Sequence, residues 1–405
     1  MEYGVIIIGA GQAGLSTALS LRKRKYSGSI LLIGEEKYPP YQRPPLSKKF
    51  LSSNIENKKL FFKSKDFLDR QNIKVLTNTC VSQINKDSKT IVLMDDSEFS
   101  YENLVISTGS SLKKMPSSSN KNIYYLRTID DAINIKNSIK ESKEIVVVGG
   151  GFIGLEIASV AIDQNIKVTV IEMEDRLMKR SLSNSMAIFL QKKHSSKGVI
   201  FKFNTPIKDI IDYQGRKRII CSNGELIDAD AVIVGIGVEP NIGLATQSKL
   251  ECMDGIKVDK NGKTSNENIF AAGDCSSHPN SIFGIRIRLE SVHNAIEQGK
   301  TVAASITGLS EPYNQTPWFW SDQYNLKLKI AGLIRDYNAE CIIGRREDEK
   351  FAIFFLKNRQ LIAVEAINNQ KAFLKGRKLI TEQMKIPRAV IKQGNKYMAN
   401  WILEK

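Results

Sequence analysis

The sequence predicts an α/β protein made of two doubly wound, parallel-sheet domains and a smaller C-terminal α+β domain. A strand, a glycine-rich turn, a helix and a second strand follow one another near the N-terminus, and the same order returns from residue 145. Beyond Pro312, apolar and polar residues alternate instead, which indicates an antiparallel sheet. At 405 residues the chain is longer than one hydrophobic core usually supports, so several domains are expected.

The first repeat lies between apolar runs at residues 5–8 and 30–33. Three glycines in G-x-G-x-x-G spacing form its turn: Gly9, Gly11 and Gly14. Such glycines permit a tight turn, close approach of a pyrophosphate and close helix packing, while the helix N-terminus attracts the anion. Glu35, just beyond the second strand, suits the hydroxyls of an adenosine ribose. The pattern predicts a Rossmann-like dinucleotide site, and a glycine-rich turn in a flavodoxin-like sheet is the alternative.

The second repeat lies between apolar runs at residues 145–148 and 168–171. Its glycines are Gly149, Gly151 and Gly154. Glu172 ends the second strand, where a carboxylate accepts hydrogen bonds from a free 2′-hydroxyl and repels a 2′-phosphate. NADH is therefore favoured over NADPH, with the reservation that Arg176 and Lys179 follow closely enough to reach a 2′-phosphate.

The order of these patterns also predicts the domain boundaries. A polar stretch over residues 113–122 is typical of a crossover between domains, and we expect the chain to cross back near residue 237. Strands near residues 326–330, 352–356 and 361–364, with a helix over roughly 369–384, would form the third domain. The predicted domains are 1–112 with 238–312, then 113–237, and finally 313–405.

The composition is that of a globular protein, with 42% apolar and 25% charged residues. No apolar run approaches the ~18 residues that span a bilayer, and the N-terminus lacks the features of a secretory signal. We therefore expect a cytoplasmic protein that does not enter a membrane. The net charge of +16 favours acidic partners, although a drift of composition along the whole chain explains it equally well.

The cysteines indicate neither a disulfide framework nor a redox dithiol. They are odd in number, scattered, and form no C-x-x-C or C-x-x-x-x-C pair: Cys80, Cys221, Cys252, Cys275 and Cys341. The sequence shows no cluster with metal-ligand spacing either, so no metal site is expected.

Several longer motifs resemble a known family. Two glycine fingerprints followed by Ala271-Ala272-Gly273-Asp274 resemble the two-dinucleotide-binding flavoproteins, whose arrangement is glutathione-reductase-like. Within that superfamily, four segments and nearly the whole chain resemble the oxygenase-coupled, putidaredoxin reductase-like NADH-ferredoxin reductases. These segments are YQRPPLSK (41–48), LRT (126–128), LESVHNA (289–295) and PWFWSDQY (317–324). The resemblance implies that the first fingerprint holds FAD and the second holds NADH.

The resemblance assigns further residues to the FAD. Arg43 and Arg127 would contact its phosphates or adenine side, although each would also be unremarkable as a surface arginine. Thr108-Gly109 would close the site, and Asp274 would bond the ribityl chain. A helix beginning near residue 291 would direct its positive end at the flavin N1 and O2 atoms. Its first residues are Ser291, Val292 and His293, of which His293 is expected to be non-catalytic.

Three residues are predicted to act in electron transfer itself. Lys48 would lie beside the flavin and pair with Glu156, where the pair would orient the nicotinamide and favour reduced flavin. A purely structural salt bridge is the alternative. Trp320 would cover the flavin near its exposed edge, a plausible exit for electrons, and an ordinary core tryptophan is the alternative.

The electron acceptor is indicated by what the sequence lacks. Where thiol-dependent members of the superfamily carry a cysteine or a dithiol, this chain has Tyr41, Gln42 and Arg43, which excludes thiol chemistry. The resemblance and the basic charge together predict an acidic [2Fe-2S] ferredoxin that serves a cytochrome P450 or a ring-hydroxylating dioxygenase. A standalone NADH oxidase and a binding flavoprotein similar to apoptosis-inducing factor are the alternatives, and no nucleic-acid partner is expected.

Overall fold

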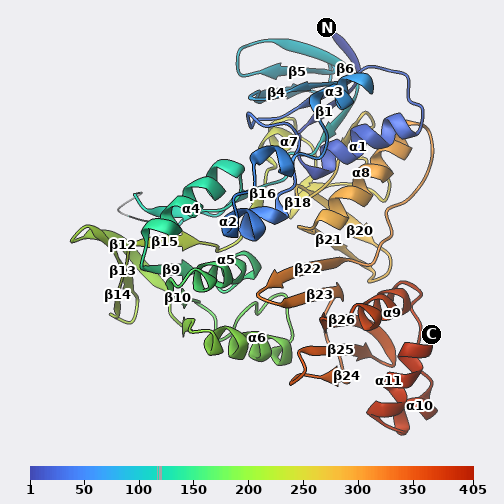
Figure 1. Ribbon diagram of the computed structural model, residues 1–405. Helices are drawn as coiled ribbons and strands as arrows, with labels where there is room; N and C mark the ends of the chain where they lie inside the picture. Colours follow the sequence, from blue (N-terminus) through green and yellow to red (C-terminus); the bar gives the residue numbers. More distant parts are fainter. Residues whose placement is uncertain (116, 118–120) are drawn as a thin grey trace. The chain divides into compact units, whose positions relative to one another are not determined.

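The computed structural model describes residues 1–115, 117 and 121–405, and its parts can be followed by label in Figure 1. The described chain divides into two compact units. The first unit contains Met1–Gln42, Lys58–Ser111 and Glu239–Phe319. The second contains Arg43–Asn57, Leu112–Val238 and Trp320–Lys405. The three-domain boundaries stay a prediction, and residues 116 and 118–120 of the predicted crossover lie outside the described residues.

The main sheet of the first unit has the order β3-β2-β1-β6-β5-β4, and β19 pairs with β6. Strands β3, β2, β1, β6 and β19 run parallel, whereas β5 and β4 are antiparallel additions. The strands are β1 (Glu2–Ile8), β2 (Ile30–Ile33), β3 (Ile73–Leu76), β4 (Val81–Asn85), β5 (Thr90–Leu93), β6 (Glu98–Ile106) and β19 (Ile269–Ala271). Both apolar runs predicted around the first glycine turn are therefore strands, and the first extends further toward the N-terminus than predicted.

Two helices of the first unit pack directly against each other. They are α1 (Gln12–Lys23) and α8 (Val292–Ile306). A Cβ atom at Gly299 of α8 would lie only 2.9 Å from the carbonyl oxygen of Ala13 in α1. The backbones of the two helices approach each other this closely because Gly299 has no side chain.

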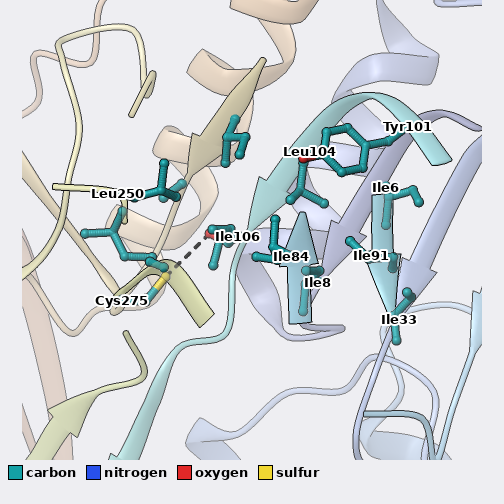
Figure 2. Packing of buried hydrophobic residues seen from close by; sticks show 14 of the residues in the cluster. Ile6, Ile8, Ile33, Ile84, Ile91, Tyr101, Leu104, Ile106, Leu250 and Cys275 are labelled. Atoms are coloured by element: carbon teal, nitrogen blue, oxygen red, sulfur yellow. Dashed lines mark hydrogen bonds between the residues drawn. The ribbon is translucent and has the colours of Figure 1, made fainter. Parts of the chain in front are cut away.

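The core of the first unit lies partly under its main sheet (Figure 2). Alternate residues of β1, Ile6 and Ile8, point into this cluster together with Leu104 and Ile106 of β6. Cys275 closes the cluster, with its Sγ atom 3.5 Å from the carbonyl oxygen of Ile106. Val5 and Ile7 of β1 are buried in a second cluster on the opposite face, which explains the continuous apolar run.

The remaining elements of the first unit are small. They include a four-stranded sheet of order β17-β18-β20-β21, made of β17 (Cys252–Met253), β18 (Gly255–Lys257), β20 (Ser276–Asn280) and β21 (Ile285–Ile287). The short helices are α3 (Lys65–Arg70) and α7 (Gly243–Gln247), with a 3-10 turn, η2 (Asn57–Leu60), at the unit's edge. The chain passes between the units at five points, two of which lie within β7 (Ser110–Leu112) and β16 (Val238–Pro240).

The second unit contains a five-stranded parallel sheet of order β11-β10-β9-β15-β8. Its strands are β8 (Ile123–Tyr125), β9 (Glu144–Val148), β10 (Lys167–Ile171), β11 (Ile200–Lys202) and β15 (Ala231–Val234). The helices that connect them are α4 (Ile129–Glu141), α5 (Phe152–Asp163) and α6 (Asn184–Ser196). A separate antiparallel sheet follows, made of β12 (Ile207–Tyr213), β13 (Arg216–Cys221) and β14 (Leu226–Ala229).

The C-terminal part of the second unit is built on an antiparallel sheet of order β22-β23-β26-β25-β24. The strands are β22 (Trp318–Gln323), β23 (Leu326–Gly332), β24 (Ala339–Arg345), β25 (Lys350–Lys357) and β26 (Gln360–Ile367). Helices α9 (Gln370–Thr381), α10 (Arg388–Lys392) and α11 (Asn395–Glu404) follow, and α9 packs on the sheet through Gly376. The remaining short elements are η1 (Pro44–Ser47) and α2 (Lys49–Ser52).

These sheets confirm the predicted fold class. Each of the two parallel sheets contains one strand–turn–helix–strand unit with a glycine-rich turn, and a separate α+β element follows at the C-terminus. The predicted strands and the helix beyond Pro312 are present as β23, β25, β26 and α9.

Candidate functional site

The first glycine-rich turn lies between β1 and α1, and two of its glycines are required by the backbone. Gly9 has a φ of +106°, and a Cβ there would lie 2.2 Å from the carbonyl oxygen of Ser107. A Cβ at Gly14 would lie 2.1 Å from the carbonyl oxygen of Gly9. Gly11, by contrast, has open space at the Cβ position, at the N-cap of α1. The turn is thus closed toward the protein and open where a phosphate would approach the helix N-terminus.

The second turn, between β9 and α5, repeats this geometry. Gly149 has a φ of +100°, and a Cβ there would lie 2.5 Å from the carbonyl oxygen of Gly235. A Cβ at Gly154 would lie 2.3 Å from the carbonyl oxygen of Gly149, whereas the nearest atom at Gly151 is 3.9 Å away. No acidic residue occupies the first turn of α1 or α5, so neither helix N-terminus is neutralised by its own side chains.

The two acidic residues predicted to bind ribose follow the second strand of each repeat. Glu35 is exposed beyond β2, and it helps to raise the pKa of the nearby Cys80 thiol, whose burial is the larger cause. Glu172 follows β10, and its carboxylate oxygens accept hydrogen bonds from the backbone N–H groups of Gly150 (2.7 Å) and Glu174 (2.9 Å). Glu172 is therefore held against the glycine turn, and each oxygen keeps further acceptor capacity for ribose hydroxyls.

The two basic residues that would reach a 2′-phosphate are both engaged within their own loop. The guanidinium of Arg176 donates to the carbonyl oxygens of Leu182 and Lys179, each at 3.0 Å. The ammonium of Lys179 pairs with Glu174 at 2.9 Å and Asp175 at 3.3 Å, and these contacts raise its pKa. This arrangement agrees with the preference for NADH inferred from Glu172.

Most of the residues that the resemblance assigns to FAD lie in the first unit, and three of them follow the ends of β6 and β19. The Thr108 hydroxyl donates to the carbonyl oxygen of Asn241 at 2.7 Å, and Gly109 has a φ of +69°. The Asp274 carboxylate accepts a hydrogen bond from the Ser110 hydroxyl at 3.1 Å. The loop before Asp274 is fixed at Gly273, whose N–H donates to Gln298 at 2.6 Å. The structure thus brings Thr108, Gly109 and Asp274 to one edge of the main sheet.

The predicted helix N-terminus at residue 291 is present as the start of α8. Ser291 is its N-cap and accepts a hydrogen bond from the Asn294 N–H at 3.1 Å, and Val292 is the first helical residue. The His293 ring lies beside Trp318, with 5.6 Å between ring centroids.

Arg43, Arg127 and Trp320 belong to the second unit, so their predicted contacts with FAD stay predictions. A guanidinium nitrogen of Arg43 donates to the carbonyl oxygen of Arg127 at 2.5 Å. The N–H of Arg127 donates to the Asp131 carboxylate. The same carboxylate accepts from the Thr128 N–H in the capping box at the start of α4. Trp320 is half-buried on β22.

Lys48 and Glu156 form an ion pair within the second unit. The Lys48 Nζ atom lies 2.8 Å from the Glu156 carboxylate, and the Glu156 residue is only 3% exposed. Two hydroxyl groups complete the surroundings of this carboxylate: Ser47 donates to one oxygen and Ser321 to the other, each at 2.5 Å. The sequence reasoning missed both serines, although they lie inside the YQRPPLSK and PWFWSDQY segments.

The part of the chain that the structure describes contains no group of three His, Cys, Asp or Glu side chains able to hold a metal ion. None of its helices combines the length and apolar character needed to cross a membrane.

Comparison with known proteins places the chain in a family. Residues 3–299 match the family described as pyridine nucleotide-disulphide oxidoreductase, and residues 318–399 match the reductase C-terminal family. The chain belongs to the pyridine nucleotide-disulphide oxidoreductase family. Within this family it is 38% identical to the rubredoxin-NAD(+) reductase of Pseudomonas putida, over 91% of this chain and 96% of the relative.

Two solved structures of the family are very similar to this chain. The ferredoxin reductase for the CYP199A2 system from Rhodopseudomonas palustris has a TM-score of 0.94 and 34% identity, with 98% of each chain covered. The covalent putidaredoxin reductase-putidaredoxin complex has a TM-score of 0.92 and 31% identity, again with 98% of each chain covered. The resemblance to putidaredoxin reductase-like proteins is thereby confirmed.

The family's description names disulphide chemistry, but the surroundings of the cysteines in this chain disfavour the thiolate form. Burial is the largest cause in every case, and it raises the pKa of all five thiols, that of Cys341 to about 12. The thiolate is the reactive form of cysteine, so none of these residues is prepared to act as a redox thiol. The geometry supports the interpretation that this member of the family works without one.

Proposed function

We propose that this chain is an FAD-dependent NADH-ferredoxin reductase that supplies single electrons to a [2Fe-2S] ferredoxin serving an oxygenase. The observation that carries the proposal is the combination of two open dinucleotide turns with five free cysteines whose surroundings disfavour the thiolate. A chain that binds two dinucleotides but has no reactive thiol needs an acceptor that takes electrons directly. Relatives and solved structures of the family carry the names of rubredoxin, ferredoxin and putidaredoxin reductases, which agrees with such an acceptor.

The residues of the first unit fit an FAD molecule. The open face at Gly11 admits a pyrophosphate, Glu35 suits the ribose, and the edge formed by Thr108, Gly109 and Asp274 suits the ribityl chain. The start of α8 would supply backbone N–H groups to developing negative charge. FAD held by these residues would supply the conversion between the two-electron chemistry of NADH and the one-electron chemistry of a ferredoxin.

The residues of the second unit fit NADH. The start of α5 is open at Gly151, and Glu172 is held by two backbone N–H groups in a position that accepts ribose hydroxyls. A 2′-phosphate would meet this carboxylate, while Arg176 and Lys179, the basic side chains that follow it in sequence, are engaged elsewhere. Charge repulsion without a compensating cation disfavours NADPH.

The Lys48–Glu156 pair is proposed to orient the nicotinamide and to favour the reduced flavin. Burying two charges costs free energy that their mutual attraction often does not offset. Stabilisation of the fold alone therefore does not explain the Lys48–Glu156 pair. Removal of either partner would leave the other charge buried and unpaired. Trp320, next to Ser321 on β22, is proposed as the exit for electrons.

The ferredoxin partner is proposed to be acidic and to contact a basic surface formed by α9, α10 and α11. Residues 366–405 contain nine Lys or Arg but only two Asp or Glu. Opposite charges steer two proteins into contact at a rate that falls as salt increases. The exposed basic side chains of these helices are Lys371, Lys378, Arg388, Lys392 and Lys396, and Lys385 and Lys405 are exposed between and after them.

The test is anaerobic NADH oxidation by the purified holoprotein, with and without a panel of [2Fe-2S] ferredoxins and a rubredoxin, at low and high salt. We expect cytochrome c reduction to require a ferredoxin and to decline with salt. Bleaching of the flavin by NADH with no acceleration by any ferredoxin would leave the two-dinucleotide fold intact but refute the acceptor assignment. In a separate aerobic assay without ferredoxin, rapid turnover with oxygen alone would instead indicate an NADH oxidase.

A further inference from the structure

Glu156 is the end of a hydrogen-bonded chain that runs through the second unit to His194. The Ser321 hydroxyl, bound to Glu156 at 2.5 Å, accepts a hydrogen bond from the side-chain amide of Gln323 at 3.0 Å. The amide oxygen of Gln323 lies 2.8 Å from His194 Nε2, and His194 Nδ1 lies 3.0 Å from the Tyr324 hydroxyl. Five side chains from α5, β22, the turn after β22 and α6 are thus connected in one line.

The local structure explains why these side chains meet. Ser321 and Gln323 are two positions apart on β22, so they lie on the same face of the strand. That face is buried, whereas Trp320 and Asp322 on the other face are partly exposed. Tyr324 follows in the turn with a φ of +54°, and its ring packs against His194 with 4.9 Å between centroids.

The hydrogen-bonded line of side chains is buried along most of its length. Ser321 and His194 are 0% exposed and Gln323 is 1% exposed. Polar groups in such positions cost free energy unless they are fully paired, and apolar side chains of similar size would cost less. A continuous polar line through an apolar interior therefore calls for a reason beyond stability.

The direction of every hydrogen bond follows from one condition, that Glu156 is ionised beside Lys48. A carboxylate only accepts, so Ser321 must donate its single proton to it. The Ser321 oxygen then accepts from the Gln323 NH₂ group, which turns the Gln323 carbonyl toward His194. His194 must donate from Nε2, and its Nδ1 atom accepts from the Tyr324 hydroxyl. All four donors point toward Glu156.

The protonation of His194 and Tyr324 agrees with these donor and acceptor assignments. Burial lowers the pKa of His194 to about 4, so the ring is neutral near pH 7 and carries one proton. Burial also raises the pKa of Tyr324, with a contribution from Asp163, so its hydroxyl remains a donor. Charged groups lie at both ends of the hydrogen-bonded line. Lys48 pairs with Glu156 at one end. Asp163 influences Tyr324 at the other end, where Lys197 Nζ also lies 5.9 Å from the Tyr324 ring centroid.

We propose that Ser321, Gln323 and His194 are positioning residues that form a directed hydrogen-bond relay and hold Glu156 ionised and oriented toward Lys48. The proposal rests on the function proposed above for the Lys48–Glu156 pair. A line of donors that all point at one carboxylate stabilises its charged form. The relay also connects the nucleotide-binding helix α5 to the C-terminal strand β22 within the second unit.

The first test is independent of catalysis and measures the protonated nitrogen of His194. The chain has three histidines, so NMR of holoprotein labelled with ¹⁵N-histidine gives few resonances, and those of His194 are assigned by their loss in His194→Gln. We expect a neutral ring protonated at Nε2 that stays neutral down to about pH 5. Protonation at Nδ1, or a charged ring at neutral pH, would overturn the relay.

The second test is single-turnover flavin reduction by NADH, followed across pH. In Ser321→Ala and His194→Leu, we expect slower reduction and an acid limb that moves up by about one pH unit, a tenfold change in the protonation equilibrium. His194→Gln offers an amide N–H and an oxygen in place of the two ring nitrogens, so we expect it to restore the wild-type profile. Unchanged profiles in Ser321→Ala and His194→Leu would overturn the relay.

A matched control and one further variant separate the possible failures. Ser142 is also buried, and its hydroxyl donates to the carbonyl oxygen of Ser138 at 2.8 Å on α4, so Ser142→Ala controls for loss of a buried hydroxyl. Its pH profile is expected to match wild type. If Glu156→Gln itself reduces its flavin at the wild-type rate, the function proposed for Glu156 fails, and the NMR result alone then decides whether the relay exists.

Discussion

Replacement of Glu365 by glutamine should make the stability of the protein less dependent on pH. Glu365 lies on β26, is 0% exposed, and accepts hydrogen bonds from the Ser183 N–H (2.8 Å) and hydroxyl (2.6 Å) at the N-cap of α6. Burial raises its pKa from 4.5 to about 7, with Glu340 raising it slightly and Ser183 and Arg176 lowering it. The carboxyl group is thus easier to keep neutral in the folded protein than in the unfolded chain.

The sign and size of the effect follow from this difference. Because the folded pKa lies above the unfolded one, the stabilising contribution is complete below about pH 4.5 and is lost as the pH rises through about 7. A difference of about 2.5 pH units corresponds to about 3 kcal/mol in total, of which about 2 kcal/mol falls between about pH 5.5 and pH 8.5. Glu365→Gln stays neutral at every pH and can keep both contacts with Ser183.

The assay is urea unfolding of the holoprotein at the two pH values. We expect the stability of Glu365→Gln relative to wild type to increase by about 2 kcal/mol from about pH 5.5 to pH 8.5. Glu349→Gln is the control, because a hydrogen bond from Lys193 lowers the pKa of Glu349, so that its carboxylate is ionised across this range in both states. If the difference in unfolding free energy between Glu365→Gln and wild type does not change with pH, the raised pKa inferred for Glu365 is refuted.

Three further predictions concern the proposed site. Glu172→Gln should weaken NADH binding by about tenfold and improve the relative use of NADPH, measured as kcat/KM for each nucleotide, and unchanged discrimination would remove Glu172 from the ribose site. Lys48→Ala should retain FAD but slow flavin reduction by about tenfold or more in single-turnover mixing, because it leaves Glu156 buried without its cation, and wild-type rates would make Lys48 merely structural. Lys371→Glu with Lys378→Glu should raise the KM for the ferredoxin several-fold at low salt and leave NADH oxidation with ferricyanide unchanged. If the double variant and wild type have the same KM for the ferredoxin, this part of the surface does not take part in docking.

A charge-matched control accompanies the docking prediction. Lys65→Glu with Lys249→Glu reverses two exposed charges of the first unit, which does not contain the C-terminal helices, and alters net charge by the same amount. If both double variants weaken ferredoxin equally, long-range attraction by the net charge explains the effect rather than a local contact.

The glycine turns and the buried strands could be predicted from sequence because their signal is local. The apolar run at Ile30–Ile33 coincides with β2, and Gly9 and Gly149 adopt the left-handed conformations that the fingerprint requires. The Lys48–Glu156 pair came from the resemblance, since no local pattern connects residues so far apart in the chain. The relay through Gln323 to His194 was missed for the same reason, because three of its four hydrogen bonds join residues that are more than 100 positions apart.

Other elements were missed because their strands bury too little to show a period. Strand β24 has only one buried residue, Cys341, and its alternation is lost among half-buried and exposed neighbours. Strands β12 to β14 include charged pairs such as Arg218 with Asp228, at 2.7 Å, which give them the composition of loops. In such strands, pairing with neighbours decides the structure more than intrinsic preference does.

The contact at Gly299 links two helices that begin at different parts of the proposed FAD site. Helix α1 starts at Gly11, where the pyrophosphate would lie, and α8 starts after Ser291, where the flavin would lie. Because α8 rests on the backbone of α1 at this point, one missing side chain sets the spacing between both ends of the ligand. A methyl group at this position would alter that spacing while each helix stayed intact. The expected effect is therefore a lower affinity for the long cofactor rather than a loss of helical structure.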